Sequence, residues 1–294
     1  MRAVVVTTFG GPEAVEVVEN EVPEPGARQI RIRVAAATLN PVDAGVREGV
    51  FGGAGERIGL GWDVAGTVDA TGEASGWSVG DEVVALVYGV LKPLGTHAEY
   101  VVVDADAVAK APLSVDAVHA ATIPLNALAA VQALDLLKVT PGQSLLVTGA
   151  AGAVGGYAVQ LAAHRGISVT ALAREADEEL VRSLGADRLV SGAEGGFDAV
   201  LDAAVLGEPA LARVRDGGTY VGVIPHAEPA SVRGVRVDAV EVNADGSQLA
   251  ELVRLADEGL LTLRVADTYA LDDAAKAHAR LAEGGVRGRL VLVP

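Results

Sequence analysis

A glycine-rich stretch at residues 148–166, TGAAGAVGGYAVQLAAHRG, has residue types that suit the binding of a phosphate group. Its pattern A-x-G-x-x-G, starting at Ala150, matches the spacing of turns that bind dinucleotides, with alanine in the first position. The segment SLLVT at 144–148 predicts a strand before the turn, and the small residues after it predict a helix. Free N–H groups at the start of such a helix attract an anion, usually a pyrophosphate. We therefore predict that a dinucleotide contacts these turn residues: Gly149, Ala151, Gly152, Ala153, Val154 and Gly155.

The same stretch admits two other interpretations. Residues 145–163 carry no charge and hold Gly152 and Gly156 at the spacing of a membrane-helix contact. The glycines dilute the hydrophobicity, and Pro141 with Gly142 indicates a turn just upstream, so a membrane span is disfavoured. A glycine turn with a structural role alone is the second alternative.

The residue after the next predicted strand indicates which dinucleotide binds. Apolar alternation predicts a strand that ends near Ala173, followed by a helix that Gly185 closes. A site for NAD would carry an acidic residue here, whereas Arg174 stands at the strand end. A guanidinium suits the 2′-phosphate of NADPH, although Glu175 could face the same pocket and a solvated surface arginine is the alternative.

Further strands extend the pattern to a doubly wound, parallel α/β sheet. Residues 186–190, 197–204 and 217–224 each predict a strand, which gives five or six parallel strands in all. Open sheets of this kind bind ligands at the carboxyl ends of their strands. We therefore assign Val223 and Ile224 to the nicotinamide side of the cofactor.

The segments on either side of this sheet have a different sequence pattern. Before residue 115, short β-rich runs are separated by glycine and proline turns, which predicts a compact, largely antiparallel, barrel-like domain. The tail at 284–294 ends in a strand without a following helix, so we expect it to return to that domain. The predicted domains are 1–115 completed by 260–294, with 116–259 as the inserted nucleotide-binding domain.

Composition excludes several partners. The net charge of −16 repels nucleic acid and anionic lipid surfaces. The chain has no cysteine, hence no disulfide and no thiolate zinc ligand. The N-terminal valine run is too short for a signal peptide, so we expect a cytoplasmic protein.

Several motifs together resemble the medium-chain dehydrogenase/reductase superfamily, and within it the zinc-independent NADPH:quinone oxidoreductase (zeta-crystallin-like) group. The resemblance spans almost the whole chain. It rests on LNPVD at 39–43, GWDVAG at 61–66, VGDEV at 79–83, AATIPLNAL at 120–128, GAAGAVG at 149–155 and GGVRGRLVLVP at 284–294. It implies a GroES-like, mainly β barrel domain with an inserted Rossmann domain that binds NADPH. It also implies a homodimer.

The resemblance assigns a role to Asn40. Zinc-dependent relatives have a cysteine at this position, and a histidine and a glutamate at the positions of Trp62 and Asp63, so we expect no metal. It places Asn40 beside the nicotinamide, where the amide would hydrogen-bond a substrate carbonyl as a catalytic group. A turn asparagine before Pro41 is the alternative.

The chain departs from this group at three positions. Gly45 and Phe51 stand where relatives often have tyrosines, and Ala129 stands where they usually have a threonine near the nicotinamide. These departures put phenol stacking and proton donation in doubt, and they shift cofactor contacts to Asn126 or to the backbone. Arg289 stands where relatives usually have a lysine near the cofactor, with a solvated surface arginine as the alternative.

The expected activity is hydride transfer from NADPH to an electrophilic acceptor. Without a Lewis acid, the substrate must already be activated, as a quinone or an α,β-unsaturated carbonyl is. The proton would come from water or from a donor that the sequence does not identify. An enoyl reductase acting on a thioester and a catalytically silent NADPH-binding protein are the alternatives.

Overall fold

The computed structural model describes residues 1–192 and 194–294, which form two compact units. Unit 1 comprises Met1–Leu125, Asn243–Glu258 and Leu263–Pro294, and unit 2 comprises Asn126–Val242 and Gly259–Thr262. Residues 116–125 and 243–258, predicted from the sequence to lie in the nucleotide-binding domain, therefore belong to unit 1, whereas residues 260–262, predicted to lie in the first domain, belong to unit 2.

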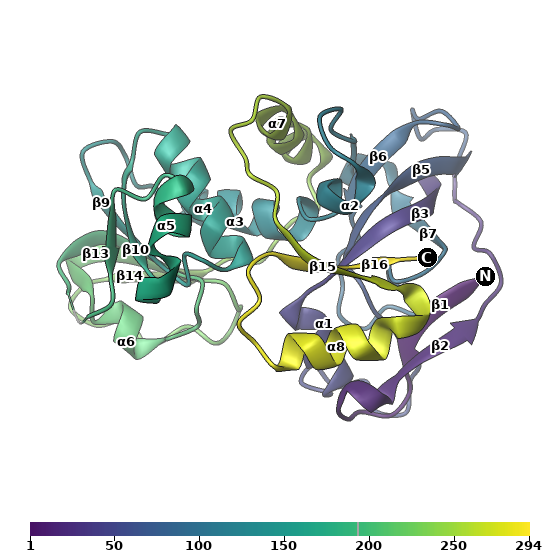
Figure 1. Ribbon diagram of the computed structural model, residues 1–294, viewed down its shortest axis with the longest axis horizontal. Coiled ribbons are helices and arrows are strands. Elements are labelled where there is room, and N and C mark those ends of the chain that lie inside the picture. Colours follow the sequence, from purple (N-terminus) through teal and green to yellow (C-terminus); the bar gives the residue numbers. More distant parts are fainter. Residues whose placement is uncertain (193) are drawn as a thin grey trace. The chain divides into compact units, whose positions relative to one another are not determined.

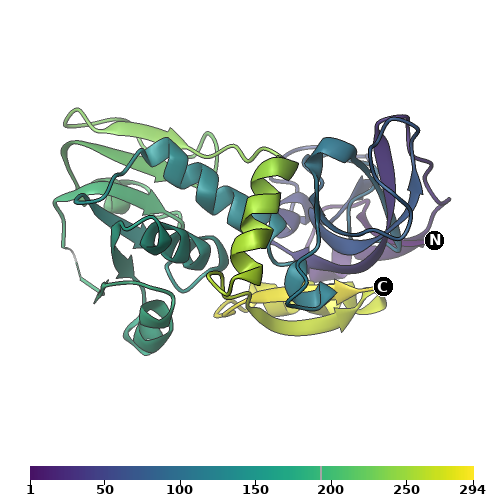
Figure 2. The same ribbon diagram turned by 90° about the horizontal axis from the view of Figure 1, so that it is seen from above.

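Unit 2 is built on a six-stranded parallel sheet with the order β11-β10-β9-β12-β13-β14. The strands lie side by side in the teal-to-green part of Figure 2. Their bounds are β9 (Ser144–Thr148), β10 (Ser168–Leu172), β11 (Arg188–Val190), β12 (Phe197–Asp202), β13 (Val214–Gly222) and β14 (Arg236–Ala239). This order reverses direction between β9 and β12, which confirms the doubly wound sheet and creates a switch point at those two strands.

Helices join the parallel strands of unit 2 (Figure 1). They are α3 (Pro124–Leu137), whose first two residues belong to unit 1, with α4 (Ala153–His164), η3 (Glu175–Asp177), α5 (Glu178–Ser183) and α6 (Glu208–Leu211). The small residues of α4 are buried along most of its length, because glycine and alanine let a helix lie close to a sheet. The uncharged stretch 145–163 is thus a strand, a turn and a packed helix, as predicted.

One other segment has the length and composition of a membrane span. It covers Ala117–Leu137, and 78% of its most apolar window is buried inside the protein. A core helix has the same character, since burial on all sides permits an apolar surface all round.

Unit 1 contains two sheets. A seven-stranded sheet has the order β15-β16-β3-β5-β6-β8 with β7 paired to β3, and a three-stranded sheet has the order β2-β1-β4. The strands are β1 (Arg2–Val6), β2 (Val15–Glu19), β3 (Gln29–Leu39), β4 (Ile58–Gly59), β5 (Asp63–Thr71), β6 (Glu82–Leu86), β7 (Tyr100–Asp104), β8 (Val108–Lys110), β15 (Val265–Ala270) and β16 (Arg289–Val293). Pairing is antiparallel except between β15 and β16.

Strand β3 organises this unit. Ile30, Ile32 and Val34 are buried on alternate positions, so one face of β3 packs into a core while the other meets water. Its end pairs with β16 in antiparallel register, with Leu39 opposite Leu290. The tail therefore returns to this unit, as the sequence predicts.

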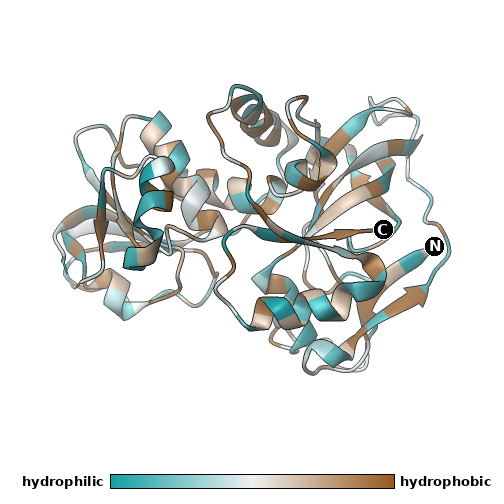
Figure 3. Cartoon of the chain, viewed as in Figure 1, coloured by the Kyte–Doolittle hydropathy of each residue, from teal (hydrophilic) through white to brown (hydrophobic). Residues whose placement is uncertain are grey.

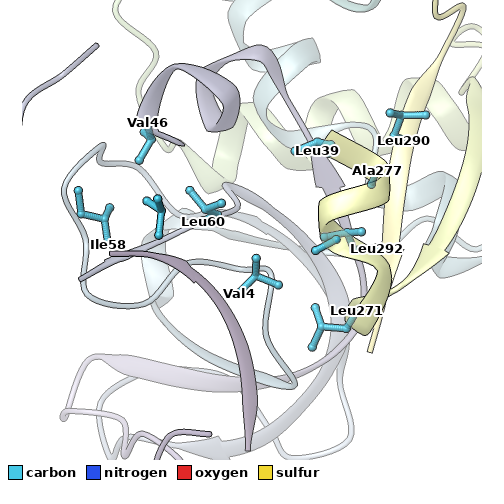
Figure 4. Close-up of a cluster of buried hydrophobic side chains, with 11 residues drawn as sticks. Val4, Leu39, Val46, Ile58, Leu60, Leu271, Ala277, Leu290 and Leu292 are labelled. Carbon is cyan, nitrogen blue, oxygen red and sulfur yellow. The ribbon is translucent and has the colours of Figure 1, made fainter. Parts of the chain in front are cut away.

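A core formed by β1, β3, β16 and two helices supports the end of β3. Its labelled side chains in Figure 4 are Val4, Leu39, Val46, Ile58, Leu60, Leu271, Ala277, Leu290 and Leu292. The helices and 3-10 turns of unit 1 are η1 (Pro12–Ala14), α1 (Pro41–Arg47), η2 (Ala105–Ala107), α2 (Ala117–Ala120), α7 (Gly246–Asp257), η4 (Leu271–Asp273) and α8 (Ala274–Ala282). Figure 3 shows hydrophilic residues on α8, which also contributes Ala277 to this core.

Helix α7 packs against η2 and β8. Its first residue, Gly246, lies so close to that segment that an added Cβ atom would approach the carbonyl oxygens of Asp106 and Val108 to 2.6 Å. Asp245 caps the helix by accepting hydrogen bonds from the backbone N–H groups of Ser247 and Gln248. A glycine at this point is what allows α7 to join unit 1.

Candidate functional site

The glycine turn of unit 2 connects β9 to α4 directly. Gly149 has a φ of +59°, a left-handed conformation that glycine adopts without strain. Its carbonyl oxygen accepts a hydrogen bond from the N–H of Gly152, which is the N-cap of α4. Gly152 has no side chain with which to cap the helix, so nothing bulky stands over the helix end.

A close backbone contact explains why residue 155, the last glycine of the pattern, has no side chain. A Cβ atom on Gly155 would lie 2.3 Å from the carbonyl oxygen of Gly149 and 2.8 Å from its carbonyl carbon. A Cβ atom on Gly152 would lie 3.0 Å from the same oxygen. The helix start therefore sits directly on the turn, which any side chain at Gly155 would push apart.

This turn can hold an anion. Helix α4 is 12 residues long, and its first turn contains no acidic residue, so its positive dipole end is not neutralised from within the helix. Ala151 and Ala153 are buried beside the turn, and Ala153 and Val154 are the first two residues of α4. The arrangement fits the diphosphate of a dinucleotide, because the backbone can approach phosphate oxygens only where side chains are absent.

Strand pairing brings Arg174 to the same edge of the sheet. Leu172 at the end of β10 lies opposite Thr148 at the end of β9, and the N–H of Ala150 donates to the carbonyl oxygen of Leu172 at 3.4 Å. Arg174 follows two residues later and is exposed. Among the residues described, its guanidinium has no hydrogen-bond or ion-pair partner, so it is available to a ligand.

The carboxyl ends of β9, β12 and β13 are braced by one buried carboxylate. Asp202 accepts hydrogen bonds from the Thr148 hydroxyl at 2.6 Å, the Tyr220 hydroxyl at 2.9 Å and the Gly207 N–H at 2.8 Å. Burial, with Asp202 beside it, raises the pKa of the Tyr220 phenol. No local sequence pattern reveals this role of Asp202, because its partners come from separate strands and loops.

Val223 and Ile224 directly follow β13, at the strand end where the sequence analysis places them. Ile224 is exposed and Val223 is half-buried. Both therefore lie at the carboxyl edge of the sheet, the same edge as the glycine turn. Their contact with the nicotinamide stays a prediction.

A second cluster of polar groups lies in unit 1, at the end of β3. The Asn40 amide nitrogen donates to Asp63 Oδ2 at 2.6 Å and to Thr38 Oγ1 at 3.2 Å. The Thr38 hydroxyl also donates to Asp63 Oδ2. The Asn40 side-chain oxygen Oδ1 accepts a hydrogen bond from Arg289 Nη1 at 3.1 Å, although Arg289 lies 249 positions later.

These bonds define what Asn40 does in the structure. Its side chain is only 1% exposed, and both amide hydrogens are directed to protein oxygens. Asn40 thus holds Asp63 on one side and Arg289 on the other. The direct contact with a substrate carbonyl that the resemblance implies stays a prediction.

The backbone around Asn40 is fixed by a second carboxylate. Asp43 in α1 accepts from the Asn40 N–H at 2.8 Å and from the Gly61 N–H at 2.7 Å. It therefore joins the start of α1 to the residue that precedes Trp62 and Asp63. The spacing of the motif LNPVD already indicates the bond from the Asn40 N–H to Asp43, since a carboxylate three residues after an N-cap residue can accept from the N–H of that residue.

Asp63 is a buried carboxylate at the start of β5. Burial raises the pKa of Asp63 to about 6, and the nearby charge of Asp43 acts in the same direction. Hydrogen bonds from Leu125 N, Thr38 and Asn40 act in the opposite direction and lower it. The bond from Leu125 N reaches the first turn of α3. Asp63 thus links β3, β5 and α3 in unit 1.

Asp63 should make the stability of the protein depend on pH. Its folded pKa of about 6 exceeds the reference value of 3.8, so near pH 5 the folded state keeps a proton that the unfolded state has lost. Stability therefore falls as pH rises through this window, by roughly 1 kcal/mol between about pH 5 and pH 8. In Asp63→Asn this pH-dependent part of the stability should disappear. Denaturant midpoints of wild type and variant, measured at about pH 5 and pH 8, would show it. Asp106→Asn, at an exposed carboxylate, is the control, and equal pH dependence in wild type and Asp63→Asn would refute the expectation.

The other predicted cofactor residues are buried. Asn126 is 3% exposed, lies in α3 and is the first residue of unit 2. Arg289 is also buried, in unit 1, where it contacts Asn40. The surface alternative for Arg289 is therefore wrong. The contacts of these two residues with a cofactor stay predictions.

The departures from the expected motif are visible in unit 1. A Cβ atom on Gly45 would lie 3.0 Å from the Phe51 ring, so the two substituted positions are neighbours. Ala129 is buried within α3. Across the described residues, no group of three or more His, Asp or Glu side chains has the arrangement of a metal site.

Comparisons with known proteins place this geometry in context. Residues 26–113 match the family model of the alcohol dehydrogenase GroES-like domain, and residues 175–292 match that of the zinc-binding dehydrogenases. The chain is 32% identical to the NADPH-dependent alkenal/one oxidoreductase of Arabidopsis thaliana, over all of this chain and 80% of that protein. It is 30% identical to the 2-methylene-furan-3-one reductase of Solanum lycopersicum, over all of this chain and 79% of that protein.

A solved structure gives the same result for the fold. The quinone oxidoreductase from Coxiella burnetii aligns with a TM-score of 0.91 at 27% identity, over all of this chain and 99% of that one. The agreement covers both units and the segments that join them.

Proposed function

Because the chain belongs to the medium-chain dehydrogenase/reductase superfamily, in its quinone oxidoreductase group, we propose that it is an NADPH-dependent reductase of quinones or α,β-unsaturated carbonyls. The family resemblance and the pairing of a GroES-like domain with a Rossmann sheet are thereby confirmed. The observation that carries the proposal is the approach of Gly155 to Gly149, which leaves a side-chain-free cradle at the start of α4.

The residues of the turn bind and orient the cofactor. NADPH, when bound, supplies the hydride. The backbone from Gly149 to Gly155 holds its diphosphate, and the α4 dipole offsets part of the negative charge. We propose that Asn126, Val223, Ile224 and Arg289 make further cofactor contacts.

The cluster around Asn40 contributes position rather than bond breaking. The hydrogen bonds among Asn40, Asp63 and Thr38 fix the end of β3 and the start of β5. A rigid arrangement of this kind lowers the reorganisation needed when charge develops on a substrate oxygen.

We also propose that the reaction proceeds without zinc. The chain offers Asn40, Trp62 and Asp63 where zinc-dependent relatives have Cys, His and Glu, and it contains no cysteine at all. An amide and an indole are poor zinc ligands beside thiolate and imidazole. The homodimer and the cytoplasmic location stay predictions.

The activity test follows from these proposals. Purified protein is mixed with NADPH and, in turn, a quinone, an enone and an enoyl thioester, while loss of the nicotinamide absorbance is recorded with and without a chelator. We expect turnover with the quinone or the enone that the chelator does not change. Turnover with the thioester alone would favour the enoyl reductase alternative. Tight NADPH binding without turnover of any acceptor would show that the protein is catalytically silent.

Arg174 should set the preference for NADPH. Its exposed guanidinium stands at the end of β10, where a 2′-phosphate would lie beside the glycine turn. Loss of a charge-assisted hydrogen bond costs about 2 kcal/mol, so Arg174→Ala should weaken NADPH binding by about 30-fold. Titration calorimetry should find the NADH affinity nearly unchanged.

The matched control for this experiment is Arg188→Ala, since Arg188 is an exposed arginine at the start of the adjacent β11. This variant should bind NADPH as wild type does. Equal weakening of NADPH and NADH by Arg174→Ala would mean that the guanidinium does not read the 2′-phosphate.

A further inference from the structure

Lys92 is a fixed ammonium group in the loop between β6 and β7 of unit 1. Its Nζ donates hydrogen bonds to the carbonyl oxygens of Val87 at 2.9 Å and Gly89 at 3.0 Å. It also lies 4.2 Å from the centroid of the Trp62 ring. An ammonium has three N–H donors, and the third donor of Lys92 has no acceptor among the residues that the structure describes.

The surroundings of Lys92 weaken its hold on the proton. Burial lowers the pKa of Lys92 to about 8, although the charges of Asp43 and Asp63 favour its charged form. His97 also interacts with Lys92, and burial lowers the pKa of His97, so that this imidazole is neutral near pH 7. Lys92 is therefore charged at neutral pH but close to the pH at which it releases a proton.

Apolar groups stand beside this ammonium. The Trp62 and Tyr88 rings meet edge to face, with centroids 5.4 Å apart at an angle of 90°. Tyr88 is 51% exposed, Leu91 is 45% exposed and Phe51 is 40% exposed.

The loops that carry these side chains lie side by side. A Cβ atom on Gly53 would come within 2.8 Å of Leu91 Cδ2, so the segment after Phe51 touches the segment before Lys92. A flat conjugated carbonyl compound matches this combination, because its rings or double bonds pack on aromatic and aliphatic groups while its oxygen needs a donor.

Resting on the reductase function proposed above, we propose that Lys92 is the proton donor of the reaction. Bound NADPH would supply a hydride to the β-carbon of an enone, where it would form a C–H bond, and the π electrons would move to the carbonyl oxygen. The free N–H of Lys92 hydrogen-bonds this oxygen and transfers its proton to it, which leaves a neutral enol and a neutral amine. With a quinone, transfer of the hydride to one carbonyl oxygen and of the Lys92 proton to the other gives the hydroquinone. Water then returns a proton to Lys92, so each turnover consumes one NADPH and one solvent proton.

A proton donor at Lys92 would also replace the phenol donor that the chain lacks near Asn40. At the positions where the resemblance implies tyrosines, the chain has Gly45 and Phe51, so a phenol is missing as donor there. A donor whose pKa lies near the working pH transfers protons well, and general acid catalysis typically contributes a factor of 10² to 10⁴, as an order of magnitude. The alternative is that Lys92 only holds residues 87–89 in place.

Two substitutions separate these roles. Lys92→Met removes the proton and the charge at similar side-chain length, and should lower kcat by about 100-fold. Lys92→Arg keeps a cation that can bond both carbonyl oxygens but does not lose a proton near neutral pH. The kcat of Lys92→Arg should therefore remain at least about 10-fold below that of wild type. Full activity in Lys92→Arg would overturn the proposal.

Lys110→Met is the matched control. Lys110 also lies over a tryptophan, with its Nζ 5.4 Å from the Trp77 ring centroid, and it pairs with Asp81 on the surface. Its substitution should leave kcat unchanged. NADPH affinity, measured by calorimetry, should equal that of wild type in all three variants.

The pH profile gives a second readout. In wild type kcat should fall as pH rises through about 8, because deprotonation removes the donor. Lys92→Met should lack this alkaline limb. An identical limb in Lys92→Met would assign it to another group and would overturn the proposal.

A measurement without turnover completes the test. The chain has lysines only at positions 92, 110, 138 and 276, so isotope-labelled lysine gives four side-chain NMR signals. Absence of one signal in Lys92→Met assigns it. We expect that signal to titrate near pH 8, and titration near the ordinary lysine value would overturn the proposal. Absence of wild-type turnover with every acceptor refutes the reductase function itself, whereas equal turnover in wild type and Lys92→Met refutes only the role of Lys92.

Discussion

Gly155→Ala should abolish NADPH binding at ordinary concentrations, with an increase in Kd of about 1000-fold. The added methyl carbon would lie 2.3 Å from the Gly149 carbonyl oxygen, and backbone atoms cannot move away as the end of a flexible side chain can. The helix start must shift, and several charge-assisted hydrogen bonds to the diphosphate are lost together. Titration calorimetry with NADPH measures the effect.

The control for this substitution is Gly192→Ala. A Cβ atom on Gly192 would meet nothing within 4 Å among the described residues, and its backbone is not left-handed. Gly192→Ala should therefore bind NADPH as wild type does. Circular dichroism separates a local shift from unfolding of Gly155→Ala, and wild-type affinity in a folded Gly155→Ala would rule out the glycine turn as the diphosphate site.

His278→Gln should remove a large part of the acid sensitivity of the protein. His278 is fully buried in α8, and Arg47 Nη1 donates to its Nδ1 at 3.2 Å. Burial lowers the pKa of His278 to about 3, and the charges of His97 and Arg47 act in the same direction. The folded state therefore holds a neutral imidazole that accepts from a guanidinium.

The sign of the effect follows from proton uptake. Above the reference pKa of 6.5 both states are neutral at this position, and below it only the unfolded state gains a proton. The contribution of His278 to the free energy of unfolding is therefore fully present above pH 6.5. It is lost as pH falls, by about 3 kcal/mol between about pH 7.5 and pH 4. Glutamine can still accept from Arg47 but does not titrate, so the stability of His278→Gln relative to wild type should improve by this amount.

Denaturant midpoints at several pH values measure the difference between wild type and His278→Gln. Some acid sensitivity will remain in the variant, because burial also lowers the pKa of His97. His164→Gln, at an exposed histidine, is the control and should follow wild type. A constant difference between His278→Gln and wild type at all pH values would contradict the neutral, buried imidazole.

Local patterns in the sequence predict the parts of the fold that local interactions determine. The segment 144–166 shows this best, since a β-rich run, a glycine turn and a helix of small residues each have their own signal. The return of the tail to unit 1 was also predictable, because a final strand without a helix needs an existing sheet edge. Strand β14 was missed, since its one exposed and three half-buried residues give a weak alternation.

Long-range partners were not predictable in the same way. The apolar face of α7 shows that the helix packs on something, but not that η2 and β8 receive it. Lys92 escaped notice because its acceptors are backbone carbonyls, which no sequence pattern reports. For Asn40 the motif gave the position, while the structure supplied its partners Asp63 and Arg289.

The bond between Arg289 and Asn40 has a consequence for synthesis on the ribosome. The guanidinium is made 249 positions after the amide, and β16 reaches its place beside β3 only then. Until that moment the Ala37–Leu39 end of β3 lacks its β16 partner, whereas Asn126–Val242 already contains the six strands of the parallel sheet. A nascent chain stopped before Arg289 would therefore carry a finished nucleotide domain beside an unfinished partner, which exposes a strand edge to aggregation and proteolysis.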